Sequence, residues 1–128
     1  MKILVVDDSR TMRNIIKRTL TGSMSIPEEN VSEAADGVEA MALIEAGSFG
    51  LYMVDWNMPN MDGITLLRKV REAGDQTPFM MCTTEAEKLK ILEAIKAGAS
   101  SYMVKPFTAE SIKEKVSQVM EKCVAPSS

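Results

Sequence analysis

Histidine is missing from this 128-residue sequence. Without it the chain cannot form a Ser-His-Asp catalytic site or autophosphorylate on histidine, and it lacks the commonest zinc ligand. Any phosphohistidine chemistry must therefore come from a partner. Only two cysteines are present: Cys82 ends the apolar run PFMMC and Cys123 lies in the last helical segment. Their spacing predicts free thiols rather than a disulfide framework or a metal clip.

Excess positive charge and long hydrophobic runs are also missing. The formal net charge is -3, and no stretch clusters five or more Lys and Arg residues, so we do not expect nucleic acid as a partner. No apolar run approaches the roughly 20 residues that span a bilayer, and the opening MKILVVDD is too short for a signal-peptide core. We expect a cytoplasmic protein without membrane insertion.

The sequence does contain a regular alternation of two kinds of segment. Short apolar runs predict five strands, at residues 2–6, 31–35, 51–54, 78–82 and 101–104. Segments with helical spacing follow each of them, and glycines that favour a left-handed helix end stand at positions 22, 47, 74 and 98. Candidate N-caps are Asp36, Asp62 and Thr108. We expect one α/β domain over residues 1–123, a (βα)5 doubly wound parallel sheet, with a loose tail at 124–128.

Acidic residues stand where two of these strands end. Asp7 and Asp8 follow the first strand and Asp55 follows the third. In a sheet of order 2-1-3-4-5 these ends are neighbours at the topological switch point, where ligands bind. Three converging carboxylates need a compensating cation, and oxygen ligands suit Mg²⁺. The alternative is structural: Asp8 or Ser9 caps a helix and Asp7 is a solvated loop residue.

A hydroxyl and an ammonium group are expected at the same edge of the sheet. Thr83 follows the fourth strand, and Lys105 follows the fifth and precedes Pro106, a bond for which a cis conformation is open. Singly, such residues are usually a helix cap and a solvated lysine. Beside an acidic metal site they favour the binding of phosphoryl oxygens, which need donors and positive charge.

Four stretches, DDSRTMR, DWNMPNMDG, TTEAEK and SYMVKPFT, resemble the signature stretches of bacterial two-component receiver domains. The resemblance covers essentially the whole chain and implies the flavodoxin-like fold. It also implies that Asp55 is the phosphoacceptor, a carboxylate that forms an aspartyl phosphate. Mg²⁺ would be held directly by Asp8 and Asp55, mainly through water by Asp7, and by the backbone carbonyl of Asn57.

The resemblance assigns a switch to three further residues. Lys105 would pair with the phosphoryl group, and Thr83 would hydrogen-bond to it. In the family this threonine moves toward the phosphate while an aromatic residue on the fifth strand, here Tyr102, turns inward. The protein would be a signalling switch that catalyses only its own phosphorylation and dephosphorylation.

The match is closest to the chemotaxis members of the family, through Trp56, Asn57, Glu85, Tyr102 and the KPFT stretch. It implies a CheA-like histidine kinase and a flagellar motor switch protein as partners, with a phosphatase as a third candidate, and a monomeric state. Helical spacing places Leu89 and Leu92 together on the buried stripe of the fourth helix and leaves Ile91 at its margin, partly exposed. The expected partner surface consists of Lys88, Ile91, Ile95, Tyr102, Val104 and Lys115.

Other readings keep the same fold. A phosphorelay shuttle, or a regulator of another kinase or output protein, would use the same chemistry with a different target. A Mg²⁺-dependent phosphatase is less favoured, because Asn57 rather than a second acid lies two residues after Asp55. Two features depart from the family pattern: Thr84 stands where receivers usually carry Ala or Gly, and the turn at residues 22–30 is longer.

Overall fold

The computed structural model describes residues 2–84, 90–106 and 108–124. Its five strands form one parallel sheet in the order β2-β1-β3-β4-β5, as the sequence predicts. The strands are β1 (Ile3–Val6), β2 (Val31–Ala34), β3 (Leu51–Asp55), β4 (Phe79–Thr84) and β5 (Ser101–Lys105). The helices are α1 (Arg10–Arg18), α2 (Gly37–Ala46), α3 (Gly63–Glu72), α4 (Ile91–Ala97) and α5 (Ala109–Val124).

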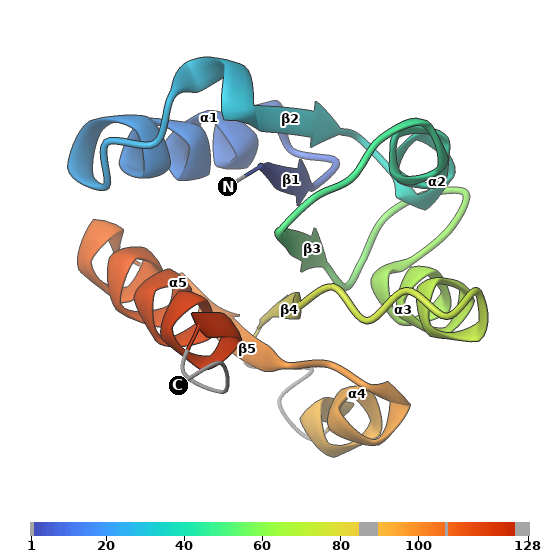
Figure 1. Ribbon diagram of the computed structural model, residues 1–128. Coiled ribbons are helices and arrows are strands. Elements are labelled where there is room, and N and C mark those ends of the chain that lie inside the picture. Colours follow the sequence, from blue (N-terminus) through green and yellow to red (C-terminus); the bar gives the residue numbers. More distant parts are fainter. Residues whose placement is uncertain (1, 85–89, 107, 125–128) are drawn as a thin grey trace.

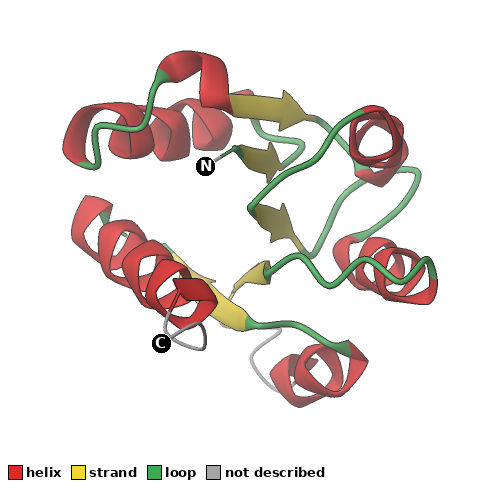
Figure 2. Ribbon diagram, in the orientation of Figure 1, coloured by secondary structure: helices red, strands yellow, loops and turns green. Residues whose placement is uncertain are grey.

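Helices cover both faces of the sheet (Figure 1). α1 and α5 lie on one face, and α2, α3 and α4 lie on the other. Figure 2 shows the strands enclosed between these two helical layers. The three inner strands β1, β3 and β4 are buried almost throughout, whereas the edge strands β2 and β5 are only partly buried. Cover on both faces explains why the inner strands are nearly continuous apolar runs.

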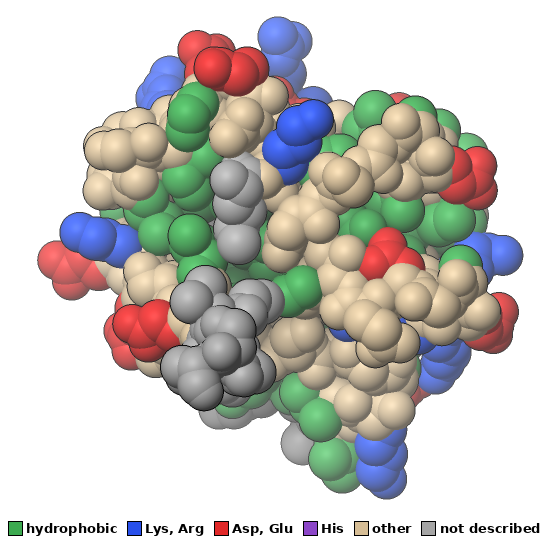
Figure 3. All heavy atoms as spheres, in the orientation of Figure 1, with side chains coloured by type: hydrophobic (Ala, Val, Ile, Leu, Met, Phe, Trp, Pro, Cys, Tyr) green, Lys and Arg blue, Asp and Glu red, His purple; other side chains and the backbone are tan. Residues whose placement is uncertain are grey.

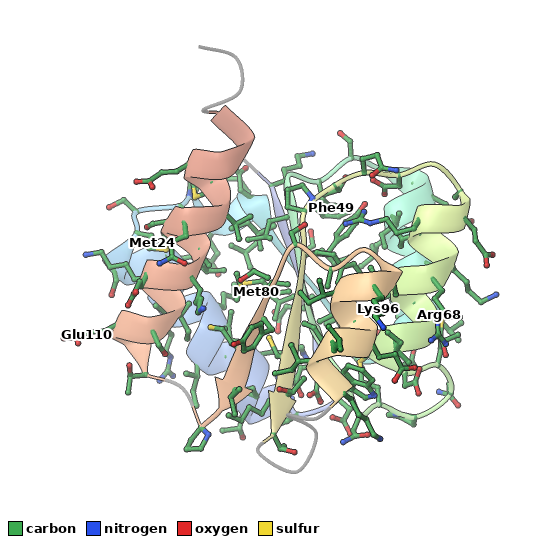
Figure 4. The ribbon with its side chains drawn as sticks, turned by 90° about the horizontal axis from the view of Figure 1, so that it is seen from below. Met24, Phe49, Arg68, Met80, Lys96 and Glu110 are labelled. Carbon is green, nitrogen blue, oxygen red and sulfur yellow. The ribbon has the colours of Figure 1, made fainter. Side chains whose placement is uncertain are left out.

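Each face of the sheet has its own hydrophobic core. Alternate residues of β1 divide between them: Ile3 and Val5 pack with α1 and α5, whereas Leu4 and Val6 pack with α2, α3 and α4. Met80 on β4 belongs to the α5 side and lies at the centre of the view in Figure 4. The long methionine side chains therefore fill the core, as their number in the sequence suggests.

Local sequence signals set most of the helix ends. Asp36, Asp62 and Thr108 each accept a hydrogen bond from a backbone N–H three residues later, as predicted for N-caps. Gly74 and Gly98 adopt the predicted left-handed conformation, with φ of 84° and 111°. The prediction was wrong for two other glycines, because Gly47 is extended at φ −149° and Gly22 lies within a π-helical turn at Thr19–Ser23.

β3, β4 and β5 each extend one or two residues beyond the predicted end. The cause is pairing at the carboxyl edge, where Asp55 lies opposite Cys82 and Thr84 opposite Lys105. Asp55 and Lys105 are therefore the last residues of strands rather than the first residues of loops. Strand pairing holds the backbone of both residues, so the direction in which each side chain leaves the sheet is fixed.

The fourth helix differs from its predicted orientation. Ile91 is partly exposed, as expected, but Leu92 is 61% exposed and does not lie on the buried stripe. The residue that α4 buries is Ala94. A small alanine at the contact lets the helix approach the sheet closely, and this tertiary fit outweighs the periodicity of the larger side chains. Leu89 lies outside the described residues.

Arg71 ties together three segments at the amino edge of the sheet. Its guanidinium donates to the carbonyl of Gly98 from Nε (3.1 Å) and Nη2 (2.9 Å), and from Nη1 to the carbonyls of Asp75 (2.7 Å) and Thr77 (2.8 Å). Burial lowers the pKa of Arg71, and the neighbouring Asp75 and Tyr52 oppose that effect. The arginine thus joins the end of α3, the approach to β4 and the turn between α4 and β5.

We expect Arg71→Ala to lower the free energy of unfolding by about 2 kcal/mol, because several partly buried carbonyls lose a charged donor. Chemical denaturation followed by far-ultraviolet circular dichroism measures this directly. Arg68→Ala is the matched control, since Arg68 only pairs with Glu93 at 2.8 Å on the surface and such pairs are worth less than about 1 kcal/mol. Equal effects of the two substitutions would contradict a structural role for the Arg71 contacts.

Charge of both signs is present on the face of the molecule shown in Figure 3. Acidic and basic side chains alternate around the outline of the face shown in Figure 3, so neither sign dominates it. Among the described helices, none has both the length and the hydropathy needed to cross a membrane.

Candidate functional site

Three carboxylates meet at the carboxyl edge of the sheet. Asp7 and Asp8 follow β1, and Asp55 ends the adjacent strand β3. One carboxylate oxygen from each lies within 4.8 Å of those of the other two. Asp7 and Asp55 are buried, whereas Asp8 is exposed. Buried carboxylates flanked by an exposed one form an oxygen-rich cluster that opens to solvent on one side and could hold a metal ion.

The start of α1 fixes Asp7 in this cluster. Ser9 caps α1 through a hydrogen bond from the Met12 N–H, and the Ser9 N–H donates to Oδ1 of Asp7 at 2.8 Å. Arg13, one turn into the helix, donates to the carbonyl of Asp7 at 2.6 Å and pairs with Glu33 at 3.2 Å. Of the two caps that the structural alternative offered, Asp8 and Ser9, it is Ser9 that caps the helix. Asp7 is only 2% exposed, so it is not the solvated loop residue of that alternative.

Lys105 lies between the two buried carboxylates. Its Nζ is 3.1 Å from Oδ2 of Asp7 and 3.1 Å from Oδ1 of Asp55. The peptide bond to Pro106 is cis, the conformation that the sequence left open. Together with Lys105, the three aspartates of the cluster carry a formal charge of −2 when all four side chains are ionised. A cluster with this charge and these oxygen donors matches a hard divalent cation.

The electrostatics of the cluster distinguish Asp55 from an ordinary carboxylate. Burial, and after it the charge of Asp7, raise the pKa of Asp55 to about 6, although Lys105 opposes both effects. Burial would lower the pKa of Lys105, but Asp55 and Asp7 outweigh it and the pKa is raised. Burial also raises the pKa of Cys82, which lies opposite Asp55, to about 12. Cys82 therefore remains a thiol and is a poor competing nucleophile.

The segment after Asp55 folds back tightly over the site. The N–H of Gly63, at the start of α3, donates to the carbonyl of Trp56 at 2.9 Å. A Cβ at Gly63 would lie 2.5 Å from the carbonyl oxygen of Asp55, so this close approach requires glycine. Asn57 lies in the connecting loop and is exposed. Sequence reasoning missed Gly63, although its position after the helix cap in NMDG is a signal for it.

Thr83 also lies at the carboxyl edge of the sheet, near the end of β4, but its side chain is on the face opposite to that of Asp55. Because Asp55 pairs with Cys82, the side chain of the next residue, Thr83, projects to the opposite side. It is fully buried, and its hydroxyl donates to the carbonyl of Met103 at 3.4 Å. This bond is long and therefore weak. The structure does not bring Thr83 into a described contact with the carboxylates in this arrangement.

The expected partner surface is partly formed by β5, α4 and α5. Ile95 is 43% exposed, and Ile91, Tyr102, Val104 and Lys115 are half-buried. Nζ of Lys115 lies 5.2 Å from the centre of the Tyr102 ring, within the range of a cation–π contact. Lys88 lies outside the described residues. A cavity of about 260 Å³ adjoins this surface and is lined by Met103, Val104, Pro106, Thr108, Ser111 and Lys115.

The sequence of this chain is similar to those of known proteins. Residues 3–117 match the family described as "Response regulator receiver domain". The chain is 46% identical over 124 residues to the chemotaxis protein CheY of Pseudomonas aeruginosa, covering 95% of this chain and 98% of that protein. It is 44% identical to the chemotaxis protein CheY-3 of Vibrio cholerae, covering 95% and 93%.

Solved structures show the same fold. The chemotaxis response regulator CheY4 of Vibrio cholerae superimposes with a TM-score of 0.82 at 35% identity, over 92% of this chain and 97% of that one. The receiver domain of the Francisella response regulator 1452 gives a TM-score of 0.84 at 29% identity, over 95% and 98%. The sheet order and the family match agree with these likenesses, and the chain belongs to the response regulator receiver family.

Proposed function

We propose that this protein is a response regulator that accepts a phosphoryl group on Asp55 from a partner histidine kinase in a Mg²⁺-dependent reaction. The observation that carries the proposal is the pair of buried carboxylates, Asp7 and Asp55, bridged by Lys105 at the edge of a receiver fold. The protein acts as a cytoplasmic signalling switch, and its phosphorylated form differs from the free form in affinity for a downstream partner.

The metal-binding role falls on the acidic cluster. Asp8 and Asp55 would hold Mg²⁺ directly, Asp7 mainly through water, and Asn57 through its backbone carbonyl. The donor set fits, since the carboxylate oxygens of the three aspartates lie within 4.8 Å of one another and one side of the cluster is exposed. When bound, Mg²⁺ neutralises charge on the phosphoryl oxygens.

Phosphoryl transfer on these residues is mainly a matter of position and charge. A carboxylate oxygen of Asp55 forms the new P–O bond as the P–N bond of the phosphohistidine breaks, and the imidazole leaves with that electron pair. Lys105 already lies against Asp55 and can move its ammonium onto the incoming phosphoryl oxygens. The strand backbone holds Asp55, so little rearrangement is needed at the nucleophile.

The switch would connect Thr83 with Tyr102. The weak hydrogen bond from Thr83 to Met103 can be exchanged for one to a phosphoryl oxygen. Movement of Thr83 would open space for Tyr102, which is half-buried on the neighbouring strand. The contact between Tyr102 and Lys115 would then change, altering the surface that also includes Lys88, Ile91, Ile95 and Val104.

The names of similar proteins suggest which partners this protein has. Because similar proteins are named for chemotaxis, we propose a CheA-like kinase as the donor and the flagellar motor switch as the target, with a phosphatase as a further partner. Phosphorylation is expected to raise affinity for the N-terminal peptide of the motor switch protein. Unchanged affinity for that peptide in a binding assay, with phosphorylation intact, would favour the alternative of a phosphorelay shuttle.

The direct test of the site uses Trp56, the only tryptophan, which is 4% exposed and adjoins Asp55. Its fluorescence is expected to change saturably on addition of Mg²⁺ and again on addition of beryllofluoride, a phosphoryl analogue. Asp55→Asn is the control, and it should abolish the response to beryllofluoride. A wild-type protein that responds to neither addition, and that shows no Mg²⁺ binding by calorimetry, would rule out the proposed chemistry.

A further inference from the structure

A short bridge joins the loop after β3 to the start of α2. Nδ2 of Asn60 donates to Oδ2 of Asp36 at 2.7 Å, and the N–H of Gly37 donates to the carbonyl of Met61 at 3.2 Å. A Cβ at Gly37 would lie 2.7 Å from the Met61 side chain, so the two segments touch directly. Figure 1 shows the loop passing α2 on its way to α3.

Two features fix the relative position of Asp36 and Asn60 in the bridge. Asp36 is 7% exposed and uses both carboxylate oxygens, one for the Glu39 N–H at 2.9 Å and one for Asn60. These two hydrogen bonds, the first from Glu39, lower the pKa of Asp36, so it stays an ionised acceptor at neutral pH. Asn60 has a φ of 66°, a left-handed conformation that asparagine adopts more readily than most residues. Backbone conformation and side-chain partner therefore both favour asparagine at this position.

The bridge acts on the segment that carries Asn57. That segment leaves the sheet at Asp55 and is fixed at its far end by the hydrogen bond from Gly63 to Trp56. Between these ends, the hydrogen bond from Asn60 to Asp36 attaches the segment to the N-cap of α2, next to the contact of Met61 with Gly37. Because β1 lies between β2 and β3, the bridge spans the edge where the carboxylates meet.

We infer that Asp36 and Asn60 are positioning residues that hold the backbone carbonyl of Asn57 toward the acidic cluster, and so set the affinity of the site for Mg²⁺. This inference rests on the proposed function, in which that carbonyl is a metal ligand. Groups that orient metal ligands typically change affinity by tenfold or more when they are removed. Loss of the bridge would leave the carboxylates of Asp7, Asp8 and Asp55 in place. The backbone carbonyl of Asn57 would then be held less firmly.

Asn60→Asp tests the bridge by placing a carboxylate against Asp36. We expect the Kd for Mg²⁺, measured by Trp56 fluorescence and by calorimetry, to rise about tenfold. The added negative charge alone would tighten Mg²⁺ binding, so a weaker affinity reports the lost geometry rather than the charge. Asn60→Gly removes the side chain while keeping the left-handed backbone available, and it should weaken binding in the same way.

The exchanged pair Asp36→Asn/Asn60→Asp is the decisive variant. It restores an amide-to-carboxylate hydrogen bond in the opposite direction, keeps an N-cap for α2 and has the net charge of the wild type. We expect its Kd for Mg²⁺ to return to the wild-type value. Asp36→Asn alone should change the Kd little, since the amide of Asn60 can rotate to accept from it.

The outcomes separate this inference from the proposed function. Wild-type Kd values in Asn60→Asp and Asn60→Gly, or failure of the exchanged pair to restore binding while it remains folded by circular dichroism, would overturn the positioning role alone. A fall in melting temperature with an unchanged Kd would show the bridge to be merely structural. A wild-type protein that binds no Mg²⁺ would overturn the proposed function, and the inference with it.

Discussion

Asp55→Asn is expected to lower the rate of phosphorylation by at least about 10³-fold, to the background of the assay, because an amide oxygen is a far weaker nucleophile than a carboxylate. The measurement is acid- and base-labile incorporation of label from a phosphorylated histidine kinase. Asp55 is the only member of the acidic cluster that belongs to a strand. The sheet therefore fixes the direction in which its carboxylate points toward the phosphoryl donor. Labelling of another residue at an undiminished rate would contradict the assignment.

The same substitution should leave the protein folded and make it more stable above pH 6 without Mg²⁺. The pKa of Asp55 is raised from 3.8 to about 6 by burial and by Asp7, so the native state binds its proton more tightly than the unfolded chain does. Stability contributed by the protonated form is present at low pH and is lost as the pH rises to about 6. Removing the charge should therefore add about 1–2 kcal/mol at pH 8, after allowance for solvent screening, and nothing below pH 4.

Asp62→Asn is the matched control for both measurements. Asp62 belongs to the loop that follows Asp55 and caps α3 through a hydrogen bond from the Thr65 N–H at 3.0 Å. Asparagine caps helices about as well as aspartate does, so neither phosphorylation nor stability should change much. A loss of labelling in this control would indicate that the loop, rather than the carboxylate of Asp55, limits the reaction.

The sequence predicts the topology and the composition of the site because both depend on strand ends. Alternating apolar runs and helical segments imply a parallel sheet, and such a sheet gathers its carboxyl ends at one edge. That reasoning places Asp7, Asp8, Asp55 and Lys105 together, and the structure does the same. It requires only the order of the strands and no knowledge of individual contacts.

What the sequence does not predict depends on register and on contacts between distant segments. The side of the sheet to which Thr83 points is set by the pairing of Asp55 with Cys82, and a shift of one residue would reverse it. Asn60 reads as an ordinary turn residue, and its partner Asp36 reads as a helix cap. Their hydrogen bond joins residues that are 24 positions apart, so no local sequence pattern predicts it.

The exposure of Leu92 shows the limit of helical periodicity. α4 packs through Ala94, which is 1% exposed, while Leu92 faces outward near Arg68 and Lys96 beside α3. Figure 4 shows Arg68 and Lys96 close together on that side of the molecule. Periodicity identifies which residues share a face, but the space between helix and sheet decides which face is buried.

Lys105→Ala is expected to lower the free energy of unfolding by about 2–3 kcal/mol without Mg²⁺, because two buried carboxylates lose the cation between them. The side chains of Asp7 and Asp55 are 2% and 8% exposed, and solvent cannot replace the ammonium group fully. Adding Mg²⁺ should recover most of the loss, since the metal would supply the missing positive charge. Denaturation curves with and without Mg²⁺ measure both effects.

Lys17→Ala provides the comparison for Lys105. Lys17 also bridges two carboxylates, Glu28 at 3.4 Å and Glu33 at 3.7 Å, but the carboxylates are more exposed. Its removal should cost less than about 1 kcal/mol, with no dependence on Mg²⁺. If the two lysine variants lose equal stability, or if Mg²⁺ restores neither, then Lys105 is not the compensating cation of the cluster.

Lys105→Ala should also separate phosphorylation from signalling. The nucleophile Asp55 and the metal-binding carboxylates remain, so the variant should still accept a phosphoryl group in the presence of Mg²⁺. Without the ammonium group, however, the phosphoryl oxygens lose the ligand on β5, the strand that carries Tyr102. The phosphorylated variant should therefore show little gain in affinity for the motor switch peptide. A gain equal to that of the wild type would mean that the signal reaches the partner surface without Lys105.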